Sequence, residues 1–567
     1  MRTYDDDAFK DTFEHQFTWL RGFMRNVVRF SDKAALLDPE LGKSYTYSQL
    51  NAYSNKLARR MQKDGVGPND TVLVFLHNSP EFAMSYIAAK KLGAIFIPAS
   101  YKSSSKEIAG LININKPKVV IISYRALQSA LSAIEFIKHK PKSSVLAGVF
   151  DEDIPIQGTK EKKYEKKSPD LEENTFADYI RFESPEEIKI NHKSHIYDES
   201  IRLCTSGTTS LPKLVPINIV NEVLTAHDAI MHFGLNHKDI TLNTNPWFHR
   251  GGLHALGPCP VLYCGGTLVV CRTFKPGSTL DYIENLGITY ITGAPANLAL
   301  ITKIETKRKK KLSSLRGVLS LGSVLTKADY DNLSNNLCPN IYNNYGTTET
   351  FWNTILSPED IKADTSEIPA GYSCLDDEVL LVEMKEKGFS KPEALVPKDN
   401  ITEGEIIIRS PAKSSGSYFQ NTSMSRKKFH KGFFYTGDTG TWDEHGLITV
   451  KGRKDDMIIV SGENIYPEKV ENVLKQHPQI FDCAVTSVPD KLRGQALAAY
   501  VVPKDDNLTI EEVADFCSQS KDLNKHSRPH YFAFLKEIPL NSNGKKKRRE
   551  IKAMALEDYN NNHFTKN

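Results

Sequence analysis

Residues 71–98 have the sequence TVLVFLHNSPEFAMSYIAAKKLGAIFIP, which changes from a short apolar run to a longer mixed run and back. The apolar, β-branched run at 71–76 predicts a buried strand. Residues 81–91 predict a helix, and residues 94–98 predict a second strand. A further apolar run at 119–122 continues the alternation. Because strands that alternate with helices are typical of parallel sheets, we expect an α/β fold.

The last hundred or so residues repeat an α/β pattern of their own. They predict helices at 465–476 and 510–518 and strands at 483–488 and 498–502. A chain of 567 residues is too long for one ordinary core. We therefore expect a large, multi-subdomain N-terminal domain and a small α+β C-terminal domain, with the boundary between residues 454 and 455.

Residues 151–200 differ in character from the rest of the N-terminal part. They are rich in Lys, Glu, Asp and Pro and contain few apolar clusters. We expect a long charged surface excursion there. The net charge of +4 is small for this length and gives no argument for a nucleic-acid partner.

No stretch of the sequence predicts a membrane span, because the most apolar one, residues 82–99, is interrupted by Lys90 and Lys91. The N-terminus lacks the basic-then-apolar order of a signal peptide. The eight cysteines are scattered without a Cys-x-x-Cys pair, which favours a reducing compartment. We therefore expect a cytoplasmic protein.

The segment 204–213, CTSGTTSLPK, is the first that suggests chemistry. Small hydroxyl residues and a glycine let N–H and O–H groups converge on phosphate oxygens, and a lysine can add a point charge. A plain Ser/Thr-rich turn is the alternative. The candidate phosphate-binding residues are Thr205, Ser206, Gly207, Thr208, Thr209 and Lys213.

This loop resembles the phosphate loop of the ANL superfamily, which comprises acyl-CoA synthetases, peptide-synthetase adenylation domains and firefly-type luciferases. The family pattern is Thr-Ser-Gly-Ser/Thr-Thr-Gly-x-Pro-Lys-Gly. This chain departs from it with Ser210 and Leu214 at the usual glycines. Because glycine gives a loop its conformational freedom, we expect a stiffer loop here.

Residues 344–349, NYGTTE, match the family's Tyr-Gly-x-Thr-Glu segment. The resemblance implies that Tyr345 stacks on the adenine, that the adjacent Gly346 belongs to the cofactor-binding residues, and that Thr348 meets the α-phosphate. It also implies that Glu349, together with Thr208, holds Mg²⁺, since a hydroxyl and a carboxylate can share the metal with phosphate and water. The alternative is an ordinary turn after a buried strand.

Residues 435–438, YTGD, and the longer segment 452–467 are further matches to the family. Asp438 can accept hydrogen bonds from two ribose hydroxyls, although Thr-Gly-Asp turns are also common. The resemblance implies that Arg453 binds ribose or phosphate and that Asp455 is the hinge of a mobile C-terminal domain. It places Gly462 along the pantetheine tunnel. A structural hairpin is the alternative.

The segment 539–545, PLNSNGK, resembles the family's Pro-x-Thr-x-x-Gly-Lys, with Asn541 in place of the threonine. The resemblance implies that Lys545 bridges the substrate carboxylate and the α-phosphate. The alternative is a basic tail, because four basic residues follow. We expect these neighbours to be solvated: Lys546, Lys547, Arg548 and Arg549.

Two more segments resemble family positions near the acyl and adenine sites. His249, in NPWFHRGG at 245–252, matches a residue that gates the acyl path, although a packed core histidine is the alternative. Gly322 and Ser323 match the glycine-rich adenine wall, with Ser-Val in place of the frequent Ala-Pro.

Together the matches imply ATP-dependent activation of a carboxylic acid to acyl-AMP, with pyrophosphate release, by an N-terminal adenylation domain. The acyl group then passes to the thiol of CoA, as in an acyl-CoA synthetase. The nearest resemblance is to benzoate and 4-chlorobenzoate CoA ligases. The implied cofactors are ATP, Mg²⁺ and CoA, or the phosphopantetheine of a separate carrier protein. A non-catalytic nucleotide-binding relative and a luciferase-like oxygenase are the remaining alternatives.

Four rings fall at or beside family acyl-pocket positions, namely Trp247, His249, Phe351 and Trp352. Bulky rings shorten a pocket and offer faces for stacking, so we favour aryl or short-to-medium acyl substrates over long-chain fatty acids. The opposing interpretation is that both tryptophans point into the core. Arg250 can pair with a second carboxylate on the acid, and the alternatives are that it faces solvent or a backbone carbonyl.

Overall fold

The computed structural model describes residues 7–147, 174–189, 192–205, 212–308, 312–362, 365, 367–385, 387–460, 463–490, 494–505, 507–540 and 546–566. The chain forms two compact units. The first comprises Met1–Leu380, Ile407–Tyr435 and Gly446–Thr449, and the second comprises Leu381–Ile406, Thr436–His445 and Val450–Asn567. The expected single boundary between residues 454 and 455 stays a prediction.

One sheet of the first unit contains the strands expected around residues 71–122. Its strand order is β7-β6-β5-β3-β4-β8-β9, and β3 pairs in parallel with both β4 and β5. Every residue of β3 is buried, as the apolar run predicts. The three predicted strands and the helix between them are confirmed. The strands are β3 (Thr71–Phe75), β4 (Ile95–Pro98), β5 (Val119–Ser123), β6 (Ser143–Ala147), β7 (Asn174–Thr175), β8 (Glu199–Thr205) and β9 (Lys213–Asn218).

The connecting helix α4 (Pro80–Leu92) has clear signals at both ends. The hydroxyl of Ser79 accepts a hydrogen bond from the Phe82 amide at 3.2 Å, and Pro80 occupies the first turn. These are favoured helix starts because they satisfy or remove amides that have no partner within the helix. Gly93 ends the helix with φ +63°, a conformation that costs glycine little.

The second sheet of the first unit has the order β16-β15-β14-β13-β12-β10-β11-β1-β2. Its strands from β14 through β1 pair in parallel, whereas β2, β15 and β16 join it in antiparallel pairs. The strands are β1 (Ala34–Asp38), β2 (Lys43–Thr46), β10 (Ile240–Asn243), β11 (Thr267–Val269), β12 (Tyr290–Gly293), β13 (Gly317–Leu321), β14 (Ile341–Thr347), β15 (Phe351–Leu356) and β16 (Tyr372–Ser373).

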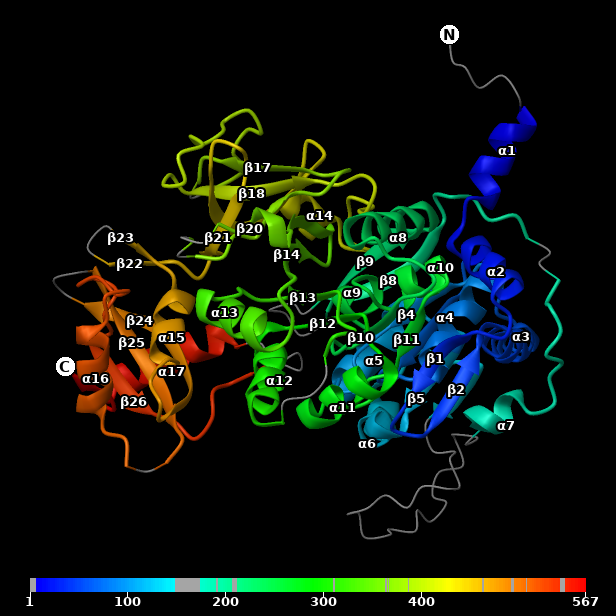
Figure 1. The fold of residues 1–567 in the computed structure, drawn as a ribbon, viewed down its shortest axis with the longest axis horizontal. Helices are drawn as coiled ribbons and strands as arrows, with labels where there is room; N and C mark the ends of the chain where they lie inside the picture. Colours follow the sequence, from blue (N-terminus) through cyan, green and yellow to red (C-terminus); the bar gives the residue numbers. More distant parts are fainter. Residues whose placement is uncertain are drawn as a thin grey trace. The chain divides into compact units, whose positions relative to one another are not determined.

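The main core of this unit lies between the two sheets (Figure 1). It contains Val74 from β3 and Leu268 from β11, together with apolar residues of α2, α3, α4, α8 and α10. Helices α5 and α6 cover the other face of the first sheet, and α11, α12 and α13 pack against the second sheet. The helices of the unit are α1 (Asp7–Gln16), α2 (Trp19–Arg29), α3 (Tyr47–Lys63), α5 (Ser105–Asn115), α6 (Leu127–Ala133), α7 (Phe176–Ile180), α8 (Ile219–Phe233), α9 (Arg250–His254), α10 (Pro258–Cys264), α11 (Pro276–Leu286), α12 (Pro295–Arg308), α13 (Lys327–Asn336) and α14 (Thr422–Lys428).

A third sheet has the order β17-β18-β20-β19, with β21 paired to β20. Its strands are β17 (Glu378–Val382), β18 (Gly404–Arg409), β19 (Phe429–His430), β20 (Phe433–Trp442) and β21 (Ile448–Arg453).

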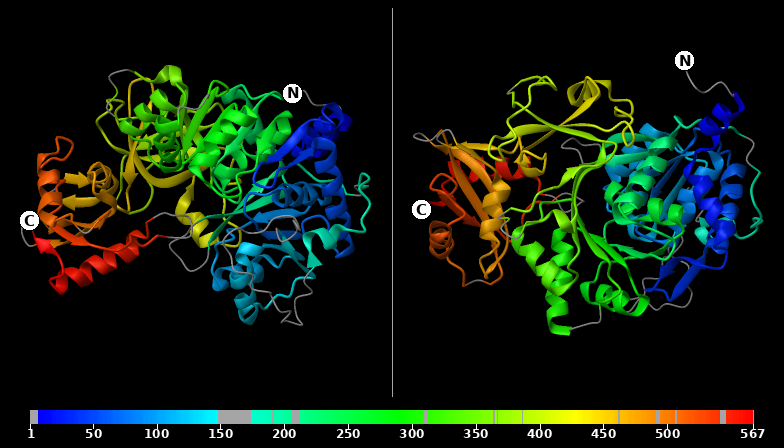
Figure 2. Two further views of the ribbon diagram at one scale, coloured as in Figure 1. Left: turned by 60° about the horizontal axis from the view of Figure 1, so that its bottom comes forward. Right: turned by 45° about the horizontal axis from the view of Figure 1, so that its top comes forward.

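The C-terminal part of the second unit is an α/β layer structure (Figure 2). Helices α15 and α16 pack on one face of the sheet β24-β25-β26-β27, and α17 packs on the other. A hairpin of β22 and β23 precedes them. The helices and strands predicted for this region are confirmed. The elements are β22 (Ile458–Val460), β23 (Glu463–Ile465), α15 (Pro467–Leu474), β24 (Ile480–Asp490), β25 (Gly494–Pro503), α16 (Ile510–Gln519), β26 (Tyr531–Phe534), α17 (Arg548–Asn560) and β27 (Thr565–Lys566).

The expected charged excursion at 151–200 lies partly outside the described residues. Where the structure describes it, the segment is packed in several places. Phe176, Tyr179 and Ile180 of α7 join the main core, and Ile188 joins it as well. The half-exposed carboxylate of Glu187 lies 2.5 Å from the buried ammonium of Lys91. The charged composition of this region therefore does not reveal that its few apolar residues pack into the main core.

The helices that the structure describes include none that is both long enough and apolar enough to cross a membrane.

We predict that Phe96→Ala lowers the free energy of unfolding by about 3–5 kcal/mol, the usual cost of deleting a buried phenylalanine ring. The ring of Phe96 is fully buried and packs edge-on against Phe82 and Tyr86. Phe182→Ala is the matched control, since Phe182 is 91% exposed and its loss should change stability by about 0.5 kcal/mol or less. Chemical denaturation of both variants measures the free energy of unfolding. Equal losses of stability in the two variants would contradict the position of Phe96 in the main core.

Candidate functional site

Several of the sequence-predicted residues gather at one edge of the second sheet. Strand β13 pairs with β14 in parallel, with Leu321 opposite Asn344. Gly322 follows β13 directly, and Tyr345 lies one residue beyond Asn344. His249 follows β10, a strand of the same parallel set. In open α/β sheets, ligands bind beyond the carboxyl ends of the strands, so this edge is the candidate site.

A tight hairpin between β14 and β15 carries Thr348 and Glu349. Thr347 pairs with Phe351 across it, and the register shifts beside Gly346. A Cβ on Gly346 would lie 1.7 Å from the carbonyl oxygen of Phe351, so this position requires glycine. Phe351 has φ +69°, which is costly for a residue with a side chain. The hairpin is therefore a strained turn that its surroundings must hold.

Glu349 is a buried carboxylate with a specific partner. It is 8% exposed, and its Oε1 accepts a hydrogen bond of 2.6 Å from the hydroxyl of Tyr418. The ammonium of Lys213 lies 5.4 Å from the centre of the same Tyr418 ring. Tyr418 therefore links the end of the phosphate loop to the hairpin, and sequence reasoning did not find it. Carboxylate oxygen is the donor type that Mg²⁺ prefers, so this buried side chain at the carboxyl edge of the sheet fits that metal.

Arg250 anchors the hairpin through a backbone carbonyl. Its side chain is 3% exposed, and Nη1 donates a hydrogen bond of 2.6 Å to the carbonyl of Thr348. Nη2 donates to the carbonyl of Lys413. Burial lowers the pKa of Arg250 to about 9, while the negative charge of Glu349 favours its charged form. Of the two partners considered for Arg250, the structure thus shows backbone carbonyls.

His249 is half-buried and precedes α9, where its carbonyl accepts the Leu253 amide at 2.9 Å. Its ring packs against Phe248, with centroids 4.4 Å apart.

The tryptophans expected near the acyl pocket are core residues. Trp247 is fully buried in the main core, and Trp352 is 1% exposed. The indole of Trp352 donates a 2.6 Å hydrogen bond to Asp228. The structure therefore favours the opposing interpretation, in which both rings pack inward. The bulk of the two tryptophan rings therefore gives no support for a shallow acyl pocket.

The two ends of the phosphate loop are adjacent strand residues. Thr205 pairs with Lys213 in the antiparallel pair of β8 and β9. Leu214, at one of the usual glycine positions, is 4% exposed and lies in β9, where it packs as a strand residue. Four of the candidate residues lie outside the described residues: Ser206, Gly207, Thr208 and Thr209. Ser210 lies outside them as well. Ser323, beside the positive-φ Gly322, is exposed.

Two predicted nucleotide-binding residues form an ion pair within the second unit. Nη1 of Arg453 lies 2.7 Å from Oδ1 of Asp438 and also donates to the carbonyl of Thr436 at 3.0 Å. Asp455 follows in a turn, with its side chain 80% exposed and its carboxylate 3.8 Å from Nη2 of Arg453. The Asp455 side chain is therefore not held by packing, and its role as a hinge stays a prediction. Gly462 lies outside the described residues.

The basic cluster after residue 545 differs from the expectation. Lys546 and Arg548 are largely buried, and both contact Glu471 of α15. The ammonium of Lys546 lies 2.6 Å from Glu471 Oε2. The expectation that all four neighbours are solvated is therefore wrong for these two, because a buried carboxylate neutralises them. Lys545 itself lies outside the described residues.

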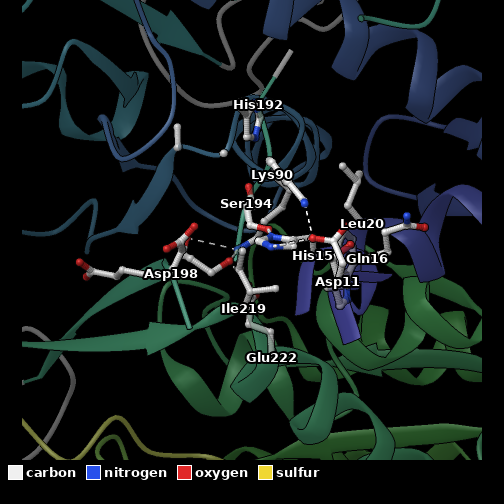
Figure 3. Close-up of a pocket in the computed structure, with 17 residues that line it drawn as sticks. Asp11, His15, Gln16, Leu20, Lys90, His192, Ser194, Asp198, Ile219 and Glu222 are labelled. Carbon is white, nitrogen blue, oxygen red and sulfur yellow. Dashed lines mark hydrogen bonds and ion pairs between the residues drawn. The ribbon is translucent and has the colours of Figure 1, made fainter. Parts of the chain in front are cut away.

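A cavity of about 270 Å³ lies elsewhere in the first unit (Figure 3). The buried ion pair of Lys90 and Glu222 lies at its wall, and Ser200 also donates to Glu222. None of the sequence-predicted site residues lines it. Its lining residues are Asp11, His15, Gln16, Thr18, Trp19, Leu20, Lys90, Gly93, Ala94, His192, Lys193, Ser194, Asp198, Glu199, Ser200, Ile219 and Glu222.

The sequence and the fold are similar to those of known proteins. The chain is 26% identical to a 4-chlorobenzoate–CoA ligase of Arthrobacter sp., over 91% of each chain. It is 30% identical to a 2-succinylbenzoate–CoA ligase of Bacillus cereus, over 76% of this chain and 83% of the relative. Its fold is similar to that of an anthranilate CoA ligase solved with anthranoyl-AMP, with a TM-score of 0.80, 24% identity and coverage of 95% and 97% of the two chains.

Two family descriptions match the sequence. Residues 469–545 match the AMP-binding enzyme C-terminal domain, and residues 23–418 match the AMP-binding enzyme family itself. The match at residues 23–418 covers well over half of the chain and includes the hairpin with Glu349. The chain therefore belongs to the AMP-binding enzyme family.

Proposed function

We propose that this protein is an acyl-CoA synthetase. It activates a carboxylic acid with ATP to form acyl-AMP and pyrophosphate, and it then transfers the acyl group to the thiol of CoA. The observation that carries the proposal is the hairpin of residues 347–351, which presents Thr348 and Glu349 at the carboxyl edge of a parallel sheet in a member of the AMP-binding enzyme family. The expected cytoplasmic location stays a prediction.

The chemistry requires positioning and charge neutralisation. A carboxylate is a poor acyl donor because oxide is a poor leaving group, and adenylation replaces that leaving group with AMP. The carboxylate oxygen attacks the α-phosphorus in line as pyrophosphate departs. Two anions must therefore be held together while charge spreads over the phosphate. No general base is needed, because the nucleophile is already ionised.

In this proposal the side chains of the first unit have separate roles. Thr348 donates its hydroxyl to the α-phosphate, and Lys213 supplies a positive charge to the phosphates. Glu349 holds Mg²⁺ through a carboxylate oxygen, while Tyr418 fixes the orientation of the carboxylate by its 2.6 Å hydrogen bond. When bound, the metal neutralises charge on the phosphate oxygens. Tyr345 and Gly346 contact the adenine ring.

Residues of the second unit are assigned to the nucleotide and to the later step. Asp438 accepts hydrogen bonds from the ribose hydroxyls, and Arg453 orients Asp438 through their ion pair. Lys545 neutralises the substrate carboxylate and the α-phosphate during adenylation. Asp455 is the hinge about which the C-terminal domain turns between the two half-reactions, and Gly462 lies along the path of the pantetheine arm.

The acid that we propose is an aryl acid. Support comes from the relatives, whose names specify 4-chlorobenzoate, 2-succinylbenzoate and anthranilate. Stacking on Trp247 and Trp352 gives no support, since both rings are buried in the core.

A panel of acids tests the function directly. Pyrophosphate release is measured with benzoate, octanoate, palmitate and a dicarboxylate, each with and without CoA. We expect benzoate to give the highest kcat/KM and thioester to form only when CoA is present. A clear preference for palmitate would overturn the aryl assignment. Acyl-AMP that is not consumed by CoA but is consumed by a phosphopantetheinylated carrier protein would identify the acceptor as a carrier. A protein that releases no pyrophosphate with any acid is not a synthetase.

We predict that Lys545→Ala lowers the rate of adenylation by about 10²–10³-fold, the scale for losing one preorganised charge-stabilising group. Thioester formation from supplied acyl-AMP should fall much less, because that step does not need the lysine. Lys547→Ala is the control, since the Lys547 side chain is 47% exposed and its ammonium pairs with Glu550. Stopped-flow assays of the two half-reactions separate the effects. Equal losses in both would contradict the role of Lys545.

We predict that Asp455→Pro forms acyl-AMP but stalls before thioester formation. Proline fixes φ and removes the freedom that a hinge needs. Asp455→Asn should keep both steps, because a small polar side chain leaves the backbone free. Single-turnover assays that quantify acyl-AMP and thioester check this. Normal steady-state turnover of the proline variant would refute the hinge.

A further inference from the structure

A buried ion cluster packs against the 347–353 hairpin, which comprises the turn between β14 and β15 and the first residues of β15. The cluster has no role in the reaction steps of the proposed function. Its centre is Lys413, which is fully buried. The ammonium lies 2.8 Å from Oδ2 of Asp228 and 2.8 Å from Oδ2 of Asp377. It also donates a 3.0 Å hydrogen bond to the carbonyl of Trp352. An ammonium has three N–H donors, so each one has a partner here.

The cluster contacts the hairpin through side chains as well as through the ammonium. Asp228 accepts the indole N–H of Trp352 at 2.6 Å, and Asp377 accepts the amide of Asn353 at 2.8 Å. The oxygen of the same Asn353 amide accepts a hydrogen bond of 2.6 Å from the hydroxyl of Thr350. The residues that follow Glu349 in the chain are therefore fixed from one side by the cluster.

Arg250 joins the same cluster to the residue that precedes Glu349. Its guanidinium bridges two carbonyls, that of Lys413 and that of Thr348. A shift of the Lys413 backbone would therefore move the anchor of Thr348. Since Phe351 adopts a costly positive φ in this hairpin, the turn keeps its shape only if its neighbours hold it.

The charges within the cluster are strongly coupled. Burial alone would raise the pKa of Asp228, but the nearby His232 and the positive charge of Lys413 lower it to about 2. Burial raises the pKa of Asp377 in spite of the same positive charge. The two carboxyl groups raise the pKa of Lys413 although it is buried, so the ammonium keeps its charge. Replacing a buried ion cluster of this kind with neutral groups often costs little stability, so stability alone does not explain the charges.

We propose that Lys413 is a positioning residue for adenylate formation: with Asp228 and Asp377 it holds the 347–353 hairpin so that Thr348 and Glu349 face the nucleotide. This inference rests on the proposed function. Lys413 acts through the backbone and does not touch the substrate. A purely structural role would change stability without changing the balance between the half-reactions, whereas a positioning role selectively slows adenylation.

The test uses the neutral triple variant Lys413→Met, Asp228→Asn, Asp377→Asn, which leaves no unpaired buried charge. We expect kcat for acid-dependent pyrophosphate release to fall roughly 10²-fold, the scale of a 1 Å misplacement of reacting groups. The Mg²⁺ concentration for half-maximal activity should rise, because Glu349 is displaced. Thioester formation from supplied acyl-AMP should change less than about threefold, since that step does not depend on the alignment of Thr348 and Glu349 for attack on ATP.

A second buried ion pair in the same unit provides the matched control. Lys90 and Glu222 are 6% and 1% exposed at their side chains and lie outside the cluster behind the hairpin. The variant Lys90→Met, Glu222→Gln should lose stability without a selective loss of adenylation. Circular dichroism and thermal melting establish that each variant is folded. If the triple variant does not fold, the single change Asp377→Asn keeps the Lys413–Asp228 pair and should give a smaller effect in the same direction.

The outcomes separate the inference from the proposed function. A folded triple variant that keeps adenylation within about threefold, or one that loses both half-reactions equally, overturns the role of Lys413 while the unaltered enzyme remains active. An equal selective loss in the Lys90→Met, Glu222→Gln control also overturns it. If the unaltered protein releases no pyrophosphate with any acid, the proposed function fails and the inference fails with it.

Discussion

Backbone pairing between the parallel strands β13 and β14 is the constraint on which the site of the first unit depends. The register that places Leu321 opposite Asn344 also brings Gly322 and Tyr345 to the same edge. A slip of one residue would turn every side chain of β14 to the opposite face of the sheet. Strand β13 is buried along its whole length and β14 alternates between buried and half-buried residues at its start. The burial that fixes this register therefore also aligns two motifs that are distant in the sequence.

The strand pairing alone does not form the site, because the hairpin after β14 must also be held in its shape by side chains from elsewhere in the chain. A strained turn with Phe351 at positive φ and Gly346 against a carbonyl is unfavourable by itself. Three buried cationic or hydroxyl groups hold it: Arg250 on the Thr348 carbonyl, Lys413 on the Trp352 carbonyl and Tyr418 on the Glu349 carboxylate. Because the three donor side chains are buried, their contacts are made in a lower dielectric than that of water and are stronger there.

Local patterns in the sequence were sufficient for the elements and for several motifs, but not for partners that are far apart in the chain. The run at 71–76 and the helix at 81–91 were predictable because periodicity and capping residues are local signals. Tyr418 lies 69 residues from Glu349, and Lys413 lies 185 residues from Asp228. Lys546 was expected to lie in a solvated tail, since its neighbours in the sequence are basic. Its partner Glu471 is 75 residues away in the chain. A single sequence contains no signal that joins such pairs.

The same limit applies to substrate size. Aromatic residues beside a motif have two outcomes, pocket wall or core, and the difference depends on which neighbours surround them. Trp352 packs inward because Asp228 offers an acceptor for its indole N–H, and Asp228 can be buried because Lys413 neutralises it. A buried charge thus determines the orientation of the Trp352 ring. Whether an aromatic residue beside a motif lines a pocket or joins the core therefore depends on its charged neighbours as much as on the ring itself.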